Sequence, residues 1–198
     1  MEHRPEEEEE LPRMTTPMAV SFYLGMLFVA MVCSALTEPG LELLLQAPEL
    51  RAIPWWGAGV GVGLMLVVAT VAAEPIFPAM RELAQELIPV VAPFGMGRVL
   101  TLAICSGVAE EALFRGPCQH ALGYVVASVL FALLHGGFSK RYIAWSTFAL
   151  VAGLSFGLLV QAYGSVWPAV VAHFVVNAIN LRRLGRMQAN TGLDRSEP

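Results

Sequence analysis

The sequence predicts an all-α membrane protein, a bundle of about six transmembrane helices around a central polar cavity. Of its 198 residues, 56% are hydrophobic and only 14% are charged, and the mean hydropathy is +0.62. A soluble domain of this length has roughly 25% charged residues. Here the charged residues cluster at the ends of long apolar segments, which is typical of a protein that crosses the membrane several times.

Six apolar segments are long enough to cross a hydrocarbon core of roughly 30 Å. They are residues 17–36, 55–77, 97–119, 121–138, 142–162 and 166–184. The stretch 80–88 carries Arg81, Glu82 and Glu86, so we expect it at the membrane surface. Glycine pairs at small-xxx-small spacing are expected to let helices pack closely. These pairs are Gly57/Gly61, Gly59/Gly63 and Gly153/Gly157.

The chain is expected to divide into a membrane domain and two polar tails. Residues 1–15 include five consecutive glutamates and no apolar periodicity, which indicates a disordered acidic tail. Residues 16–185 form the predicted transmembrane domain, with its polar motifs in a core at 97–181, and residues 186–198 form a polar C-terminal tail. The acidic tail argues against nucleic acid as a partner.

The basic residues predict how the bundle is oriented. With six crossings, nearly all of the 12 lysine and arginine residues fall on the side that holds both termini. The exceptions are Arg51 and Arg115. The positive-inside rule therefore places both termini in the cytoplasm. The N-terminal region is acidic rather than basic, so no cleavable signal peptide is expected.

Two adjacent carboxylates, Glu110 and Glu111, lie inside an apolar segment with Arg115 four residues further on. A charge within a membrane-embedded helix costs about 3 kcal/mol on insertion scales, so such residues persist as ion pairs or in water-filled cavities. Glu111 and Arg115 are i,i+4 neighbours and can pair. The Glu110 side chain points about 100° away from that of Glu111, so its carboxylate is not used in this pair and is available for another role. The alternative is an ion-pair network that only fixes helix packing.

Two further apolar segments carry histidines. His135 follows Phe131 by four residues, and His173 precedes Asn177 by four, so each pair shares one helix face. A histidine and an asparagine on one face offer two donors for a developing oxyanion, although interhelical hydrogen bonding is the alternative. Three polar clusters on three segments are most simply satisfied in one shared cavity. A carboxylate base, a histidine and such donors can together run acid–base hydrolysis.

Two other catalytic interpretations are weaker. Glu110, His135 and His173 are the candidate metal ligands, but the H-E-x-x-H helix of zinc proteases is absent. Residues 153–157 fit G-x-S-x-G around Ser155, yet that motif marks a nucleophile only at a strand-to-helix turn. Two small residues at packing spacing and an ordinary serine explain this segment more simply.

The three polar motifs resemble those of a known family. E-E-x-x-x-R at 110–115, F-x-x-x-H at 131–135 and H-x-x-x-N at 173–177 resemble the motifs of the CPBP intramembrane proteases. This family, also called Abi, includes the type II CAAX prenyl endopeptidases and bacteriocin-immunity relatives. The stretches 153–157 and 163–169 also resemble the segments that lead to the third motif. The resemblance covers about residues 99 to 180.

The resemblance implies a role for each motif residue. Glu110 would act as the general base on water together with His135. Glu111 would pair with Arg115 and hold its helix.

In the same way, His173 and Asn177 would form the oxyanion site, and Phe131 would pack against the pocket or line it. Metal-free and metal-dependent mechanisms have both been proposed for the family. We therefore expect no required cofactor, with zinc as the weaker alternative.

The resemblance also implies a function and a location. The chain is expected to be a CAAX-type endopeptidase that hydrolyses membrane-associated, prenylated or otherwise lipidated protein tails, and its compact size suits the bacterial inner membrane. One alternative is a non-catalytic scaffold or immunity-type partner. Another is a small transporter with a Glu/His relay, since intramembrane Glu and His also serve proton relays.

Helix length raises one geometric requirement. Glu110 lies about 13 residues, or roughly 20 Å, from the cytoplasmic end of its segment. His135, in contrast, lies near the cytoplasmic end of the following segment. Straight antiparallel helices would therefore hold them at different depths. If they share a site, either the segment boundaries are shifted or a helix is tilted, broken or partly outside the bilayer.

Overall fold

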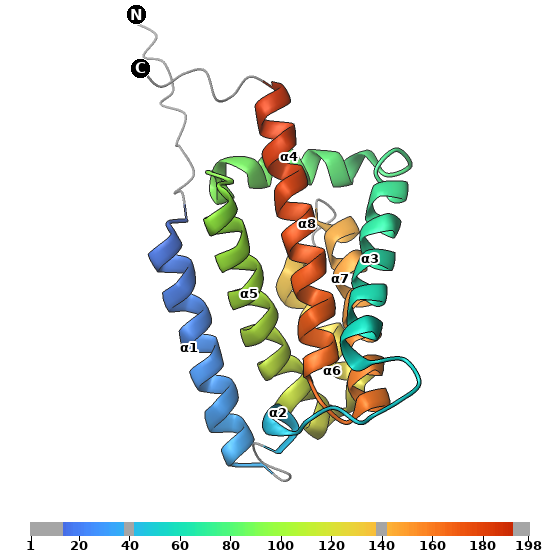
Figure 1. The fold of residues 1–198 in the computed structure, drawn as a ribbon. Helices are drawn as coiled ribbons and strands as arrows, with labels where there is room; N and C mark the ends of the chain where they lie inside the picture. Colours follow the sequence, from blue (N-terminus) through green and yellow to red (C-terminus); the bar gives the residue numbers. More distant parts are fainter. Residues whose placement is uncertain (1–13, 38–41, 138–141, 192–198) are drawn as a thin grey trace, which may run out of the picture.

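The computed structural model describes residues 14–37, 42–137 and 142–191, and every regular element in these ranges is a helix (Figure 1). The elements are α1 (Thr16–Ala35), α2 (Glu42–Leu45), α3 (Trp55–Ala73), α4 (Pro78–Val91), α5 (Met96–Leu113), the π-helix η1 (Phe114–Cys118), α6 (Gln119–Gly136), α7 (Ile143–Tyr163) and α8 (Trp167–Thr191). Nearly all of the predicted acidic tail and residues 192–198 of the predicted C-terminal tail lie outside the described ranges.

Four helical segments of the described chain are long and apolar enough to cross a membrane. They are Thr16–Ala35, Trp55–Ala73, Met96–Gly136 and Ile143–Tyr163. The third comprises α5, η1 and α6, which the sequence divides into two crossings. The all-α polytopic fold is therefore confirmed. The last predicted segment is not among the four, and its helix, α8, continues to Thr191 rather than ending at Leu184.

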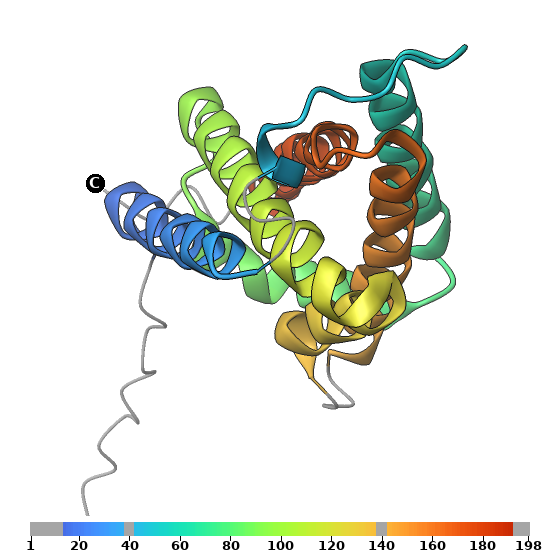
Figure 2. The ribbon, with the colours of Figure 1, turned by 90° about the horizontal axis from the view of Figure 1, so that it is seen from below.

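The long helices stand side by side, and α4 lies across one end of them (Figure 1). The start of α1 and the end of α8 lie at the same end as α4, whereas the short α2 lies at the opposite end. α1 packs on α5 at the outside of the bundle, as the view along the helices shows (Figure 2). The position of α4 agrees with the surface location predicted for residues 80–88.

The helix between the two glutamates and His135 is broken. Gly116 has a non-helical ψ of −110° inside η1, and Gly123 has φ 79° and ψ 159° inside α6. A positive φ is readily adopted only by glycine, so Gly123 allows the chain to turn where another residue would be strained. These breaks redirect α6 (Figures 1 and 2). They satisfy the geometric requirement, because a broken helix can bring His135 to the depth of Glu110.

Glycines control the distance between α3 and α8. A Cβ atom built on Gly63 would lie 2.8 Å from the carbonyl oxygen of Ala172, and one built on Gly59 would lie 2.6 Å from that of Pro168. A Cβ on Gly57 or Gly61 would meet nothing within 4 Å. The Gly59/Gly63 pair is thus a packing face, as expected. The same expectation for Gly57/Gly61 is wrong, because this pair faces away from the neighbouring helices.

We predict that Gly63→Ala destabilises the protein, because the added methyl group must push α8 backbone away from α3. Overpacking of this kind typically lowers the free energy of unfolding by about 1–3 kcal/mol. Gly61→Ala is the matched control, with the same change on the same helix and no neighbour to displace. We expect it to be neutral or to stabilise by at most about 1 kcal/mol through helix propensity.

Thermal unfolding of both variants in detergent, followed by circular dichroism, measures the difference. Equal losses of stability for the two variants would contradict close packing of α3 on α8.

Candidate active site

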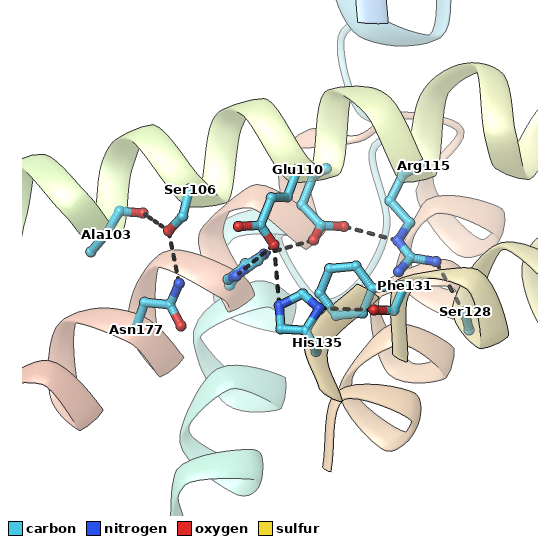
Figure 3. A network of polar contacts seen from close by, with 10 residues as sticks. Ala103, Ser106, Glu110, Arg115, Ser128, Phe131, His135 and Asn177 are labelled. Carbon is cyan, nitrogen blue, oxygen red and sulfur yellow. Dashed lines mark hydrogen bonds and ion pairs between the residues drawn. The ribbon is translucent and has the colours of Figure 1, made fainter. Parts of the chain in front are cut away.

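Helix α5 carries the two glutamates into the interior, and its geometry sends them in different directions. Successive residues of an α-helix point about 100° apart. The Glu111 side chain is fully buried, whereas that of Glu110 is 10% exposed and lines a cavity. Figure 3 shows the Glu110 carboxylate above His135, with Arg115 in η1, about one turn further along the chain. The two carboxylates therefore have different surroundings, as the spacing predicted.

Glu111 is held by two positive or proton-donating partners. Its Oε2 accepts a hydrogen bond from Arg115 Nε at 2.9 Å, and its Oε1 lies 2.7 Å from His173 Nδ1. Arg115 Nη1 also donates to Ser128 Oγ at 3.2 Å, and Arg115 is as fully buried as Glu111. The predicted i,i+4 pair is present, and it also reaches α8 through His173.

The hydrogen bonds of the two histidines indicate where their protons lie. His135 Nδ1 is 2.8 Å from the carbonyl oxygen of Phe131, which can only accept, so Nδ1 carries the proton. His173 Nδ1 likewise faces Glu111, which is ionised beside Arg115. In both neutral rings, Nε2 is then the unprotonated nitrogen.

Both Nε2 atoms are directed at one oxygen. Glu110 Oε2 lies 3.6 Å from His135 Nε2 and 3.9 Å from His173 Nε2. These separations are too long for direct hydrogen bonds, and Glu110 Oε2 is a buried oxygen with no hydrogen-bond partner in the described part of the chain. A buried polar atom without a partner requires an explanation, and a water molecule or a substrate group between these atoms would supply one.

Aromatic rings fix the orientation of both imidazoles. The Phe131 ring lies against His135, with centroids 4.2 Å apart, and Trp145 of α7 meets His135 edge-on at 5.9 Å. Phe156 stacks on His173 at 5.3 Å with an interplanar angle of 22°. Phe131 lines the cavity, in agreement with the role that the resemblance implied. The rings leave each imidazole little freedom to turn away from Glu110.

Asn177 lies one helical turn beyond His173 on α8 and also faces the cavity. Its Nδ2 donates a hydrogen bond to Ser106 Oγ at 2.8 Å (Figure 3). Ser106 precedes Glu110 by four residues on α5, so the two share a face. The structure thus brings together all six side chains that the sequence singled out: Glu110, Glu111, Arg115, His135, His173 and Asn177.

Sequence reasoning missed two polar neighbours of the site. Ser106 could have been found from its i,i+4 spacing to Glu110. Tyr23 comes from α1 and lines the same cavity as Glu110 and Ser106. A single tyrosine in an otherwise apolar segment gives no local signal of this role. The first helix therefore contributes to the site as well as to the bundle.

The cavity at the site has a volume of about 380 Å³. At roughly 30 Å³ per water molecule, it has room for water and for part of a substrate. One end is formed by Glu110 and the two imidazoles. The other lies beneath α4, whose residues Met80, Leu83 and Leu87 face it. Amphipathic α4 therefore covers an apolar extension of the polar site.

The donor set has to be considered for a metal ion. Glu110, His135 and His173 supply one carboxylate and two imidazoles, which are donor types that zinc uses. However, among the described residues no group of three or more His, Cys, Asp or Glu side chains is placed to hold a metal ion. Chelation, described below, distinguishes metal-assisted from metal-free hydrolysis.

Ser155 does not take part in the site. Its hydroxyl donates to the carbonyl oxygen of Val151 at 2.8 Å, within its own helix. The flanking glycines serve packing instead: a Cβ on Gly153 would lie 3.3 Å from Arg115 Nη2, and one on Gly157 would lie 3.1 Å from Gln119 Oε1. The G-x-S-x-G pattern therefore makes room for the buried guanidinium, as the packing interpretation expects.

These features define a polytopic helical membrane protein with a buried glutamate–histidine centre, and comparison with known proteins shows what the segment around that centre is similar to. Residues 92–179 match the family model described as "Type II CAAX prenyl endopeptidase Rce1-like". This segment is therefore similar to the Rce1-like family, and the resemblance of the three motifs to the CPBP family is confirmed. At the family level, the match supports an intramembrane endopeptidase.

The chain is also similar to the "Uncharacterized protein YpbD" of Bacillus subtilis (strain 168). The two are 29% identical over 143 residues, which cover 66% of this chain and 68% of that protein. No solved structure matches the chain. Tyr23 lies outside the residues matched by the family model, whereas the other site residues lie within them.

We predict that Arg115→Met strongly destabilises the protein, because it leaves the Glu111 carboxylate buried without a cation. Breaking a buried ion pair from one side costs about 3–5 kcal/mol. The double variant Arg115→Met/Glu111→Leu removes both charges and should recover part of the loss. Thermal unfolding in detergent measures both.

Arg51→Met is the matched control, because Arg51 pairs with Glu49 at 2.7 Å but both side chains are about half exposed. Exposed pairs contribute about 0–1 kcal/mol. If Arg115→Met lowers the free energy of unfolding no more than Arg51→Met does, the buried pair does not stabilise the bundle.

Proposed function

We propose that the protein is an intramembrane endopeptidase in which Glu110 activates water for attack on a peptide bond. The observation that carries this proposal is the asymmetry of the two carboxylates. Glu111 is neutralised by Arg115, whereas Glu110 Oε2 has no hydrogen-bond partner among the described residues and faces two imidazole nitrogens in a cavity. A structural ion pair needs no second carboxylate of this kind, but a hydrolase needs a base.

In this mechanism, a water molecule lies between Glu110 and His135. The Glu110 carboxylate accepts one proton of the water, and His135 Nε2 accepts a hydrogen bond from the other. The water oxygen attacks the carbonyl carbon, and a tetrahedral intermediate forms with negative charge on the former carbonyl oxygen. The proton held by Glu110 then passes to the nitrogen of the leaving amine as the C–N bond of the peptide breaks. The site therefore neither gains nor loses a proton over the reaction.

The oxyanion is stabilised from α8. When His173 is protonated, Glu111 holds its Nδ1–H and the Nε2–H becomes a donor toward the reacting centre. Asn177 uses one Nδ2 hydrogen for Ser106 and has a second available for the oxyanion. Donors held in place before the reaction stabilise developing charge at little reorganisation cost. Glu111 and Arg115 thus act through His173.

The cavity beneath α4 suggests the kind of substrate. Its wall toward α4 is apolar, with Leu83 and Leu87 among its residues, and Leu184 of α8 also lines it. An apolar wall next to a polar catalytic centre suits a membrane-associated protein tail that is apolar or carries a lipid. We propose that cleavage takes place in a bacterial inner membrane, with both termini on the cytoplasmic side.

We predict that Glu110→Gln abolishes peptide cleavage, because glutamine keeps the shape of the side chain but cannot accept the proton. Loss of a general base typically costs about 10²–10⁴-fold in rate. The measurement is hydrolysis of a peptide library by the purified protein in detergent or liposomes, with and without a chelator. Ser155→Ala is the control and should keep full activity.

The outcomes separate the competing functions. Cleavage that survives Glu110→Gln and His173→Ala would overturn the assignment of the site. A phenotype that persists in Glu110→Gln, without cleavage by the wild type, would indicate a scaffold or immunity-type partner. pH-coupled flux in liposomes would indicate a transporter. Loss of cleavage with chelator, restored by zinc, would replace the metal-free mechanism by a metal-dependent one.

We also predict that Tyr23→Phe lowers kcat by about 3- to 10-fold with little change in KM. The removed hydroxyl belongs to a side chain that lines the cavity with Glu110, and we expect it to donate one hydrogen bond to the reacting groups, which is worth about 0.5–1.5 kcal/mol. Tyr163→Phe is the matched control, because its hydroxyl bonds the carbonyl oxygen of Ile53 at 3.0 Å, away from the site. An equal effect of the two substitutions on kcat would remove Tyr23 from the mechanism.

A further inference from the structure

A second, smaller groove lies between α5 and α8 and has a different chemistry from the active site. It has a volume of about 300 Å³ and combines an apolar floor with a basic edge. We refer to it as the basic groove. Its residues are Met96, Val99, Leu100, Ala178, Ile179, Arg182, Arg183 and Arg186.

The arginines at this edge differ in how they are neutralised. Arg183 binds Glu74 through both carboxylate oxygens, each at 2.7 Å. Arg182 and Arg186 are exposed and form no ion pair with any described residue, and no acidic residue lines the groove. Their i,i+4 spacing places two like charges on one helix face, which is destabilising by itself. An anion bound between them would remove this repulsion.

The basic groove lies at the end of the bundle where α4 lies, and we expect the headgroups of the membrane at this end. Arg182 follows Trp167, the first residue of α8, by 15 positions, which is a rise of about 22 Å along the helix. The end of α8 lies at the same end of the bundle as the amphipathic α4 and the start of α5 (Figure 1). Long arginine side chains near helix ends place their charges at the membrane interface.

The floor of the groove is apolar and accessible. Met96 is 53% exposed and Leu100 is 39% exposed, and both lie on α5 below the arginines. An inorganic anion would satisfy the charges and leave this floor uncovered. A neutral lipid would cover the floor and leave the two cations without a counter-charge. An anionic lipid satisfies both parts, and basic pockets between transmembrane helices suit such headgroups.

We propose that the basic groove binds an anionic phospholipid. Its phosphate lies between Arg182 and Arg186, and an acyl chain follows the apolar floor along Leu100 and Ile179. This inference does not depend on the proposed function, because the groove is separate from Glu110 and its readout is lipid binding rather than cleavage.

The test uses the purified full chain in a neutral detergent. Native mass spectrometry compares the binding of phosphatidylglycerol with that of phosphatidylcholine, and thermal unfolding with each lipid gives a second readout. We expect phosphatidylglycerol to bind more tightly and to raise the Tm more. Each arginine contributes roughly 5-fold to affinity, so Arg182→Gln/Arg186→Gln should weaken phosphatidylglycerol binding by roughly 25-fold.

Arg81→Gln is the control for a general loss of positive charge, since Arg81 is an exposed residue of α4 at the same end of the bundle. We expect it to change phosphatidylglycerol affinity far less than Arg182→Gln does. Higher salt should also weaken the binding of phosphatidylglycerol, because the contacts are exposed. The measurement at two salt concentrations uses the wild-type chain, so it tests the proposal even if the double variant fails to fold.

Three results would overturn the proposal. Equal binding of phosphatidylcholine and phosphatidylglycerol would show that the groove recognises only apolar chains. An equal rise in Tm with glycerol phosphate at the same concentration would show a site for soluble phosphate instead. An equal loss of affinity in Arg81→Gln and Arg182→Gln would show that only net charge matters.

Discussion

The structure depends on the buried contacts of Glu111 with Arg115 and His173. They connect α5 to α8 in an environment where an unpaired charge is costly. The same contacts direct His173 Nε2 toward Glu110. Packing and chemistry are therefore supported by one network, and room for it is made by glycines on α7 that let the guanidinium lie close to that helix.

The proposed chemistry follows from placing two identical side chains in different environments. Glu111 has its charge balanced by a guanidinium, and Glu110 has a buried oxygen without a hydrogen-bond partner in the described structure. Different surroundings are how one site gives two carboxylates separate tasks. Helical geometry produces the difference, because adjacent residues cannot share a face.

The broken helix between α5 and α6 explains how a bundle of helices can form a compact centre. Gly116 and Gly123 interrupt the helix between the glutamates and His135. In straight helices, Glu110 and His135 would lie at different depths in the bundle and could not meet. The matched family segment, residues 92–179, contains this turn and both imidazoles. The outer helix α1 adds Tyr23 to the lining of the cavity.

The sequence by itself determined the membrane class, the intrahelical pair of Glu111 with Arg115, and the polar residues that need partners. These depend on composition and on spacing within one helix, which are local properties. Only the tertiary structure decided that His173 bonds Glu111, that Tyr23 joins the site, and that Gly57 and Gly61 face no neighbour. Such contacts join residues that are distant in the chain, and they depend on where helices break and how closely they pack.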